Sequence, residues 1–128
     1  MTTTELARAL FDAFAAGDEA AIRALCAPAF EGRQNFGPIM DLDTLIGFTL
    51  AVHGVTRDFR YEAITCTETA GGFVEEHRVC GTLGDGSSLK LAACVVAEVA
   101  GGQVLRLREY LDTAAAAALM KALASQRR

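Results

Sequence analysis

Apolar residues near the start of the chain recur with helical spacing. They stand at i, i+4, i+7 and i+8, and are Leu6, Leu10, Ala13 and Phe14. This stripe predicts an amphipathic helix of about 12 residues. Gly17 ends it, and Asp18 caps a second short helix that stops before Pro28.

A third helix is predicted after residue 40, with Asp41 or Asp43 as its cap. Its apolar side carries Leu42, Leu45, Ile46 and Leu50. Residues 29–40, which precede it, hold two glycines and Pro38 among polar residues, so they read as a loop with room for one short strand.

Beyond this helix the period of the apolar positions changes to two, which is typical of strands. Four strands are predicted, over residues 58–69, 73–83, 88–99 and 103–112. Gly-Gly or Asp-Gly pairs separate them and indicate tight hairpins. Thr113 is the expected cap of a last helix, whose apolar positions are Leu119, Met120 and Leu123.

Helices followed by an antiparallel meander and one final helix predict an α+β fold in a single domain over residues 1–128. The hairpin over residues 75–86 (EEHRVCGTLGDG) and the segment 107–112 (LREYLD) resemble the SnoaL-like members of the NTF2-like superfamily. This resemblance implies a cone-shaped, curved antiparallel sheet with N-terminal helices and a C-terminal helix, the cystatin-like α+β barrel. It also implies an apolar pocket between sheet and helices, and a dimer formed through the outer face of the sheet.

One carboxylate interrupts the apolar row of the last predicted strand. Leu105, Leu107 and Leu111 alternate there, and Glu109 occupies the same row. Side chains of a strand point to alternate faces, so Glu109 should point where the leucines point, toward a core or a cavity. A carboxylate in that place needs a partner, a proton or water.

Strand register predicts the neighbours of Glu109. If the turns at 85–86 and 101–102 are two-residue loops, His77 lies opposite Cys94, and Cys94 lies opposite Glu109. The same face would carry Val79, Val96 and Leu107. A bulge in any of these strands would reverse the prediction.

This register predicts a site with Glu109 and His77 as the catalytic pair, because an imidazole beside a desolvated carboxylate can transfer protons. The predicted ligand-binding residues are Cys94, Val79, Leu107, Val96, Phe14 and Phe48. A satisfied structural contact between histidine and glutamate is the alternative.

Neighbouring polar residues allow similar alternatives. Arg33, Gln34 and Asn35 could serve the pocket mouth or form a solvated loop. Glu75 is expected at the rim, and His53 as a partner of a helix C-terminus.

The resemblance extends to several chemistries, each of which transfers only in part. Limonene epoxide hydrolase is similar in the same two strands, and its catalytic Arg, Asp and Asp align with His77, Val79 and Glu109, so one carboxylate is missing. Ketosteroid isomerases use a tyrosine from the first helix, where this chain has Phe11 and Phe14. The similarity to polyketide cyclases offers Glu109 as the base.

Composition narrows the set of partners. The chain is 52% hydrophobic and 22% charged, with a net charge of −4 and no basic stripe, which argues against nucleic acid. So apolar a composition suggests that part of the apolar surface is covered by a second subunit, in a homodimer, or lines a cavity. No apolar run is long enough for a membrane span. No secretory signal stands at the N-terminus, so a cytoplasmic protein is expected.

The four cysteines lack CxxC spacing, and the sequence has no phosphate-binding glycine loop and no histidines with metal-ligand spacing. No cofactor and no metal are therefore expected.

Two hypotheses of function follow from these patterns. The first is an acid–base isomerase, cyclase or hydrolase that acts on a small apolar molecule. The second is a non-catalytic module that binds a small ligand or acts through a dimer.

Overall fold

The computed structural model describes residues 1–126. Its helices are α1 (Thr3–Ala16), α2 (Glu19–Leu25), α3 (Leu42–Val55) and α4 (Thr113–Gln126). Its strands are β1 (Cys26–Gln34), β2 (Thr56–Thr69), β3 (Gly72–Leu83), β4 (Ser88–Ala100) and β5 (Gln103–Leu111). The strands form one open sheet in the order β1-β5-β4-β3-β2. The predicted α+β class is confirmed.

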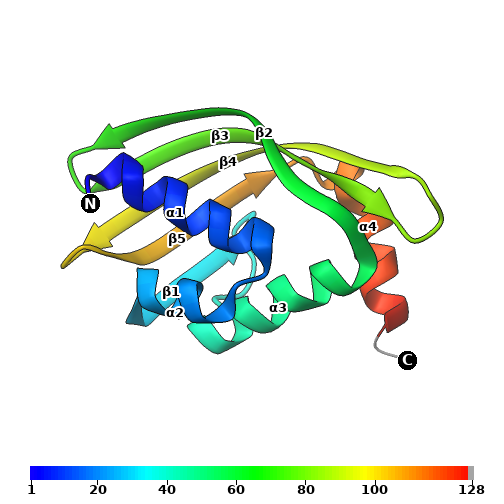
Figure 1. Cartoon of the computed structure of the whole chain (residues 1–128), viewed down its shortest axis with the longest axis horizontal. Coiled ribbons are helices and arrows are strands. Elements are labelled where there is room, and N and C mark those ends of the chain that lie inside the picture. The colour runs from blue at the N-terminus through cyan, green and yellow to red at the C-terminus, as the bar shows by residue number, and fades with distance from the viewer. Residues whose placement is uncertain (127–128) are drawn as a thin grey trace.

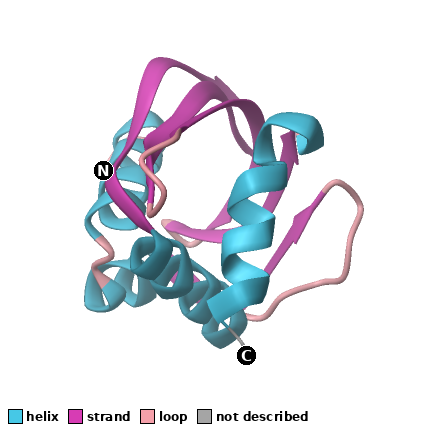
Figure 2. Cartoon of the chain, turned by 90° about the vertical axis from the view of Figure 1, so that its right-hand side faces the viewer, coloured by secondary structure: helices cyan, strands magenta, loops and turns pink. Residues whose placement is uncertain are grey.

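The sheet curves around helices that cover its inner face. In Figure 1, α1 lies along the sheet, with α2 and α3 beneath it, and α4 stands at the far end. Figure 2 looks onto that end and shows α4 on the concave side of the curved strands. Register shifts in β2, with a positive φ at Asp58 and Ala63, mark the bulges that bend this long strand. Within residues 1–126, no helix is long and apolar enough to cross a membrane.

Helix ends follow the predicted capping residues with one exception. Gly17 adopts the left-handed conformation after α1, and Asp18 and Asp41 cap α2 and α3. For α4, however, the prediction of Thr113 is wrong. The side chain of Asp112 accepts hydrogen bonds from the amides of the second and third residues that follow it, at 3.0 and 3.2 Å. An N-cap side chain makes these two bonds, so Asp112 is the cap.

The first strand was not expected in this form. Residues 26–34 form β1, which pairs in parallel with β5, so the sheet is mixed rather than purely antiparallel. Pro28 lies within this strand, and proline is tolerated there because β1 is an edge strand. The parallel pairing brings Gln34 opposite Glu109.

The predicted register between β3 and β4 is wrong by one residue. His77 pairs with Ala93, and Cys94 pairs with Glu76. The cause is the turn: Leu83 donates its N–H to the carbonyl of Ser87, which leaves a loop of three residues, 84–86, instead of two. Gly86 closes this loop with a φ of 87°, the left-handed conformation that such hairpins require.

The register between β4 and β5 also differs by one residue. The turn at 101–102 has two residues as predicted, because Ala100 pairs with Gln103. The shift arises within β5, where Leu105 has no partner and forms a bulge. Glu109 consequently pairs with Val95, and Cys94 with Tyr110.

The two shifts cancel between β3 and β5. A one-residue shift moves every side chain of the neighbouring strand to the opposite face of the sheet. Two such shifts lie between β3 and β5, so His77 and Glu109 still share a face, the inner one. β4 lies between them and receives only one slip. Cys94 and Val96 therefore point to the outer face, and the prediction that they share a face with Glu109 is wrong.

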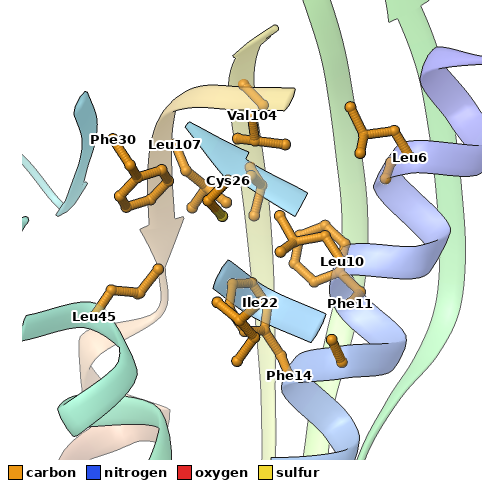
Figure 3. Close-up of a cluster of buried hydrophobic side chains, with 14 of the residues drawn as sticks. Leu6, Leu10, Phe11, Phe14, Ile22, Cys26, Phe30, Leu45, Val104 and Leu107 are labelled. Carbon is orange, nitrogen blue, oxygen red and sulfur yellow. The ribbon is translucent and has the colours of Figure 1, made fainter. Parts of the chain in front are cut away.

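The buried side chains form two clusters along the sheet. The first joins α1, α2, β1 and the start of α3 to β3, β4 and β5. Figure 3 shows Leu6 and Leu10 facing Val104 in it, with Ile22 below. The second joins α3 and α4 to β3 and β4. Their separation leaves space in the middle of the molecule, where the candidate site lies.

A glycine fixes the start of β3 against β4. A Cβ on Gly72 would lie 1.9 Å from the carbonyl oxygen of Ala97, whereas a Cβ on Gly71 would meet nothing within 4 Å. We expect Gly72→Ala to lower the free energy of unfolding by about 2 kcal/mol or more, and Gly71→Ala to change it by less than about 0.5 kcal/mol. Urea denaturation of both variants checks this, and equal midpoints would contradict the pairing.

Candidate functional site

A cavity of about 90 Å³ lies between the two hydrophobic clusters. Phe14, Leu45 and Leu107 line it from the first cluster, and Val79 and Leu119 from the second. The polar side chains of its wall are Gln34, Thr49, His53, Tyr61 and Glu109. The cavity is therefore mainly apolar, with a few polar groups converging on it, which is the usual composition of a small-molecule site.

The predicted site residues fall into three groups. Glu109 lines the cavity, as do four of the predicted ligand-binding residues, namely Phe14, Phe48, Val79 and Leu107. Cys94 and Val96 lie on the outer face of β4 and are not part of the wall. His77 faces inward but lies behind the cavity wall, with its side chain fully buried.

Glu109 is held by a hydrogen bond from the edge strand. The amide of Gln34 donates to Oε1 of Glu109 at 2.7 Å. Burial raises the pKa of Glu109, and the Gln34 hydrogen bond and the charge of His77 offset this only in part. A carboxylate with a raised pKa is a stronger base than an exposed one, which suits it to act as a general base.

The backbone beside this pair is locked by Asn35. Its N–H donates to the carbonyl of Glu109 at 2.9 Å, and its Oδ1 accepts the N–H of Leu111 at 3.0 Å. Arg33 turns away and donates to the carbonyl of Phe36. Of the three polar residues that the sequence offered for the pocket mouth, Gln34 lines the cavity, and Asn35 fixes its place.

Tyr61 is a wall residue that sequence reasoning missed. Burial and the charges of Glu109 and Glu75 raise its pKa well above the ordinary value, so the phenol keeps its proton and is a hydrogen-bond donor. The alternation of Phe59 and Tyr61 in β2 was a signal for a shared inner face. The two bulges of β2 hid it, because they interrupt the register on either side of these residues.

Glu75 was expected at the rim, and this expectation is wrong. Its exposed fraction is 2% and that of His77 is 4%, and Oε2 of Glu75 lies 2.6 Å from Nδ1 of His77. Both residues belong to the inner row of β3, which begins at Phe73. Their i, i+2 spacing was the signal in the sequence, because such residues share a face of a strand.

The imidazole of His77 is packed between two aromatic rings. Its ring centre lies 4.9 Å from that of Phe11 and 4.5 Å from that of Tyr61. Its Nε2 is buried and has no hydrogen-bond partner within the described residues. His77 is thus a neighbour of the cavity wall, tied to Glu75 on its other side.

His53 lies at the end of the cavity nearest α1. Its Nε2 is 2.8 Å from the carbonyl oxygen of Phe14, in the last turn of that helix. His53 was expected to be the partner of a helix C-terminus, and it is, but the helix is α1 and not α3, to which His53 belongs. Within residues 1–126, no group of three or more His, Cys, Asp or Glu side chains is placed to hold a metal ion.

Solved structures of known proteins share this architecture. A candidate polyketide cyclase from Pseudomonas putida is 25% identical, with a TM-score of 0.77 over 88% of this chain and 92% of that one. A candidate polyketide cyclase from Xanthomonas campestris is 22% identical, with a TM-score of 0.79 over 88% and 91%. IdmH from Streptomyces antibioticus, also a candidate polyketide cyclase, is 15% identical, with a TM-score of 0.82 over 94% and 99%.

No curated protein matches the sequence. The model of the SnoaL-like domain, in contrast, matches residues 7–107. This match spans α1 through the first half of β5, which includes most of the cavity wall. The chain belongs to the SnoaL-like domain family, with the NTF2-like fold of its structural neighbours.

Proposed function

We propose that this protein is an enzyme of the isomerase or cyclase type, which moves a proton on a small, largely apolar molecule bound in the cavity. Glu109 is the base. The observation behind this proposal is a carboxylate whose pKa is raised by burial in the wall of an apolar cavity. The candidate polyketide cyclases among the structural neighbours support the same class of reaction.

The surroundings of Glu109 suit proton abstraction. Within residues 1–126 its one hydrogen-bond donor is the neutral amide of Gln34, which orients the carboxylate without neutralising it. A buried charge without a cationic hydrogen-bond partner costs folding free energy. Such costs are typical of functional sites, where carboxylates are tuned for catalysis.

Tyr61 supplies the complementary group. Its phenol shares the cavity wall with Glu109 and keeps its proton. When a base removes a proton from carbon, negative charge develops elsewhere on the molecule, commonly on an oxygen. We propose that the Tyr61 hydroxyl donates a hydrogen bond to that oxygen.

The size of the cavity limits the ligand. About 90 Å³ is less than the roughly 300–1,000 Å³ of sites for drug-sized molecules. We therefore propose a compact ligand of one or two rings. Met120, which lines the cavity and has an exposed fraction of 39%, is the wall residue placed to move when the ligand enters.

A non-catalytic binding module is the second candidate function. The observation that favours it is that no second carboxylate joins Glu109 among the described residues that line the cavity. Native mass spectrometry of the purified protein would identify bound small molecules. The two functions then differ in Glu109→Gln, which should retain such a ligand if binding is the whole function.

The base is testable with a nitrobenzisoxazole, a small, flat and apolar probe. A base removes the proton from the ring carbon next to the nitrogen, the N–O bond breaks, and a nitrile and a coloured phenolate form. Glu109→Gln should lower kcat for this elimination by about 100-fold or more. The control is Glu76→Gln, an exposed neighbour on the outer face of β3. Wild-type rates equal to those of Glu109→Gln would contradict the proposal.

The same substitution should stabilise the protein at high pH. The pKa of Glu109 is higher in the folded than in the unfolded state. Its contribution to stability is therefore full at pH values below the pKa of the unfolded state, and it is lost as the pH rises through the pKa of the folded state. Thermal melts should place Glu109→Gln a few degrees above wild type near about pH 8, with no difference near about pH 4. A lower melting temperature of the variant at the higher pH would indicate a structural role for the carboxylate.

A further inference from the structure

Glu75 connects the buried site to a second hollow. The cleft between α1 and β2 is lined by Glu75 together with Arg8, Asp12 and Ile64. Phe11 and Tyr61 line the part of it with a volume of about 200 Å³, and the same two rings line the cavity that holds Glu109. The two hollows therefore share a wall.

His77 is the polar group inside that wall. Its ring lies against both shared aromatic side chains, and Nδ1 is bonded to Glu75 at 2.6 Å. Val95 of β4 pairs with Glu75 of β3 on one side and with Glu109 of β5 on the other. On a flat sheet the Cα atoms of the two glutamates would be about 10 Å apart, too far for direct contact.

We propose that Glu75 is a positioning residue that acts on the Glu109 carboxylate through His77, by holding the imidazole with a hydrogen bond at Nδ1. This inference rests on the proposed function and assigns a regulator to its base. Glu75 does not touch the ligand cavity, so its role is distinct from that of a catalytic residue.

Electrostatics support this arrangement. Two buried carboxylates on one face of a sheet repel each other and lose hydration, and both effects favour their neutral forms. A cation between them offsets both. The charge of His77 lowers the pKa of Glu109, against the larger effect of burial. Because Glu75 is hydrogen-bonded to that imidazole, His77 is the route by which Glu75 acts on the base.

Other titratable groups lie around Glu75, His77 and Glu109, in the cleft and in the cavity. In the cleft, Arg8, Asp12 and Glu5 of α1 and Arg60 of β2 surround the opening to Glu75. Beside Glu75, the thiol of Cys66 has a pKa raised by burial and by this carboxylate. In the cavity, Tyr61 and His53 share the wall with Glu109. Of these groups, Tyr61 is close enough to both acids for the charges of Glu109 and Glu75 to raise its pKa, whereas His77 is hydrogen-bonded to Glu75.

Glu75→Gln keeps the size of the side chain and removes its charge, so it tests the proposal directly. Two quantities are measured against pH: kcat/KM for the nitrobenzisoxazole, and the carbon-13 NMR shift of the Glu109 carboxyl carbon in the ligand-free protein. Glu75→Gln and His77→Gln should each move the midpoint of both curves to higher pH by about 1 unit. The double variant should move it no further than His77→Gln, and the rate at high pH should equal that of wild type.

The controls separate this role from a merely structural one. Glu76→Gln should leave both curves unchanged. Glu75→Asp keeps the charge but withdraws it by one methylene, and should give a smaller shift in the same direction, which also serves if Glu75→Gln does not fold. A midpoint that is unchanged or lower in Glu75→Gln, or a rate reduced equally at all pH values, would overturn the proposal. If the wild-type protein did not catalyse the elimination of the nitrobenzisoxazole through Glu109, the proposed function would be contradicted instead. The NMR titration of Glu109 would then still decide the role of Glu75.

Discussion

The partial burial of one ionisable carboxylate is the constraint on which the site depends. Glu109 lies in the wall of an apolar cavity, where water cannot fully solvate its charge. The surrounding structure compensates in two ways. The edge strand β1 presents the amide of Gln34 at hydrogen-bond distance, and β3 presents an imidazole that is itself tied to Glu75. Each compensating group comes from a different strand, so the site exists only in the folded sheet.

The fold provides the cavity by keeping its core in two parts. One cluster packs α1, α2 and the start of α3 against the sheet, and the other packs α4 and the end of α3 on β3 and β4. The bent sheet joins the two clusters, and the cavity opens where they part. The bulges in β2 and β5 that bend the sheet also decide which side chains face this space.

Much of the architecture is readable from the sequence, because capping residues and hydrophobic periodicity act locally. Gly17, Asp18 and Asp41 end or begin helices as their chemistry predicts. The inward direction of Glu109 was also readable, from the leucines that flank it in the strand. The parallel pairing of β1 was not, because no local pattern reports the orientation of an edge strand.

The register of the sheet was beyond the reach of turn residues alone. Asp-Gly in the hairpin 84–86 suits a loop of either two or three residues, and the bulge at Leu105 has no marker such as glycine. Each choice moves the strand by one residue, which misplaced Cys94 and Val96. The pair of Glu75 and His77 was within reach from their spacing on β3, but the expectation of a rim position concealed it.

A titration of the Glu109 carboxyl carbon by carbon-13 NMR in the wild-type, ligand-free protein tests the central claim most directly. The account predicts a midpoint clearly above that of the exposed Glu76 in the same spectra. A midpoint at or below that of Glu76 would show a well-solvated or ion-paired carboxylate, and would contradict the assignment of Glu109 as a buried base.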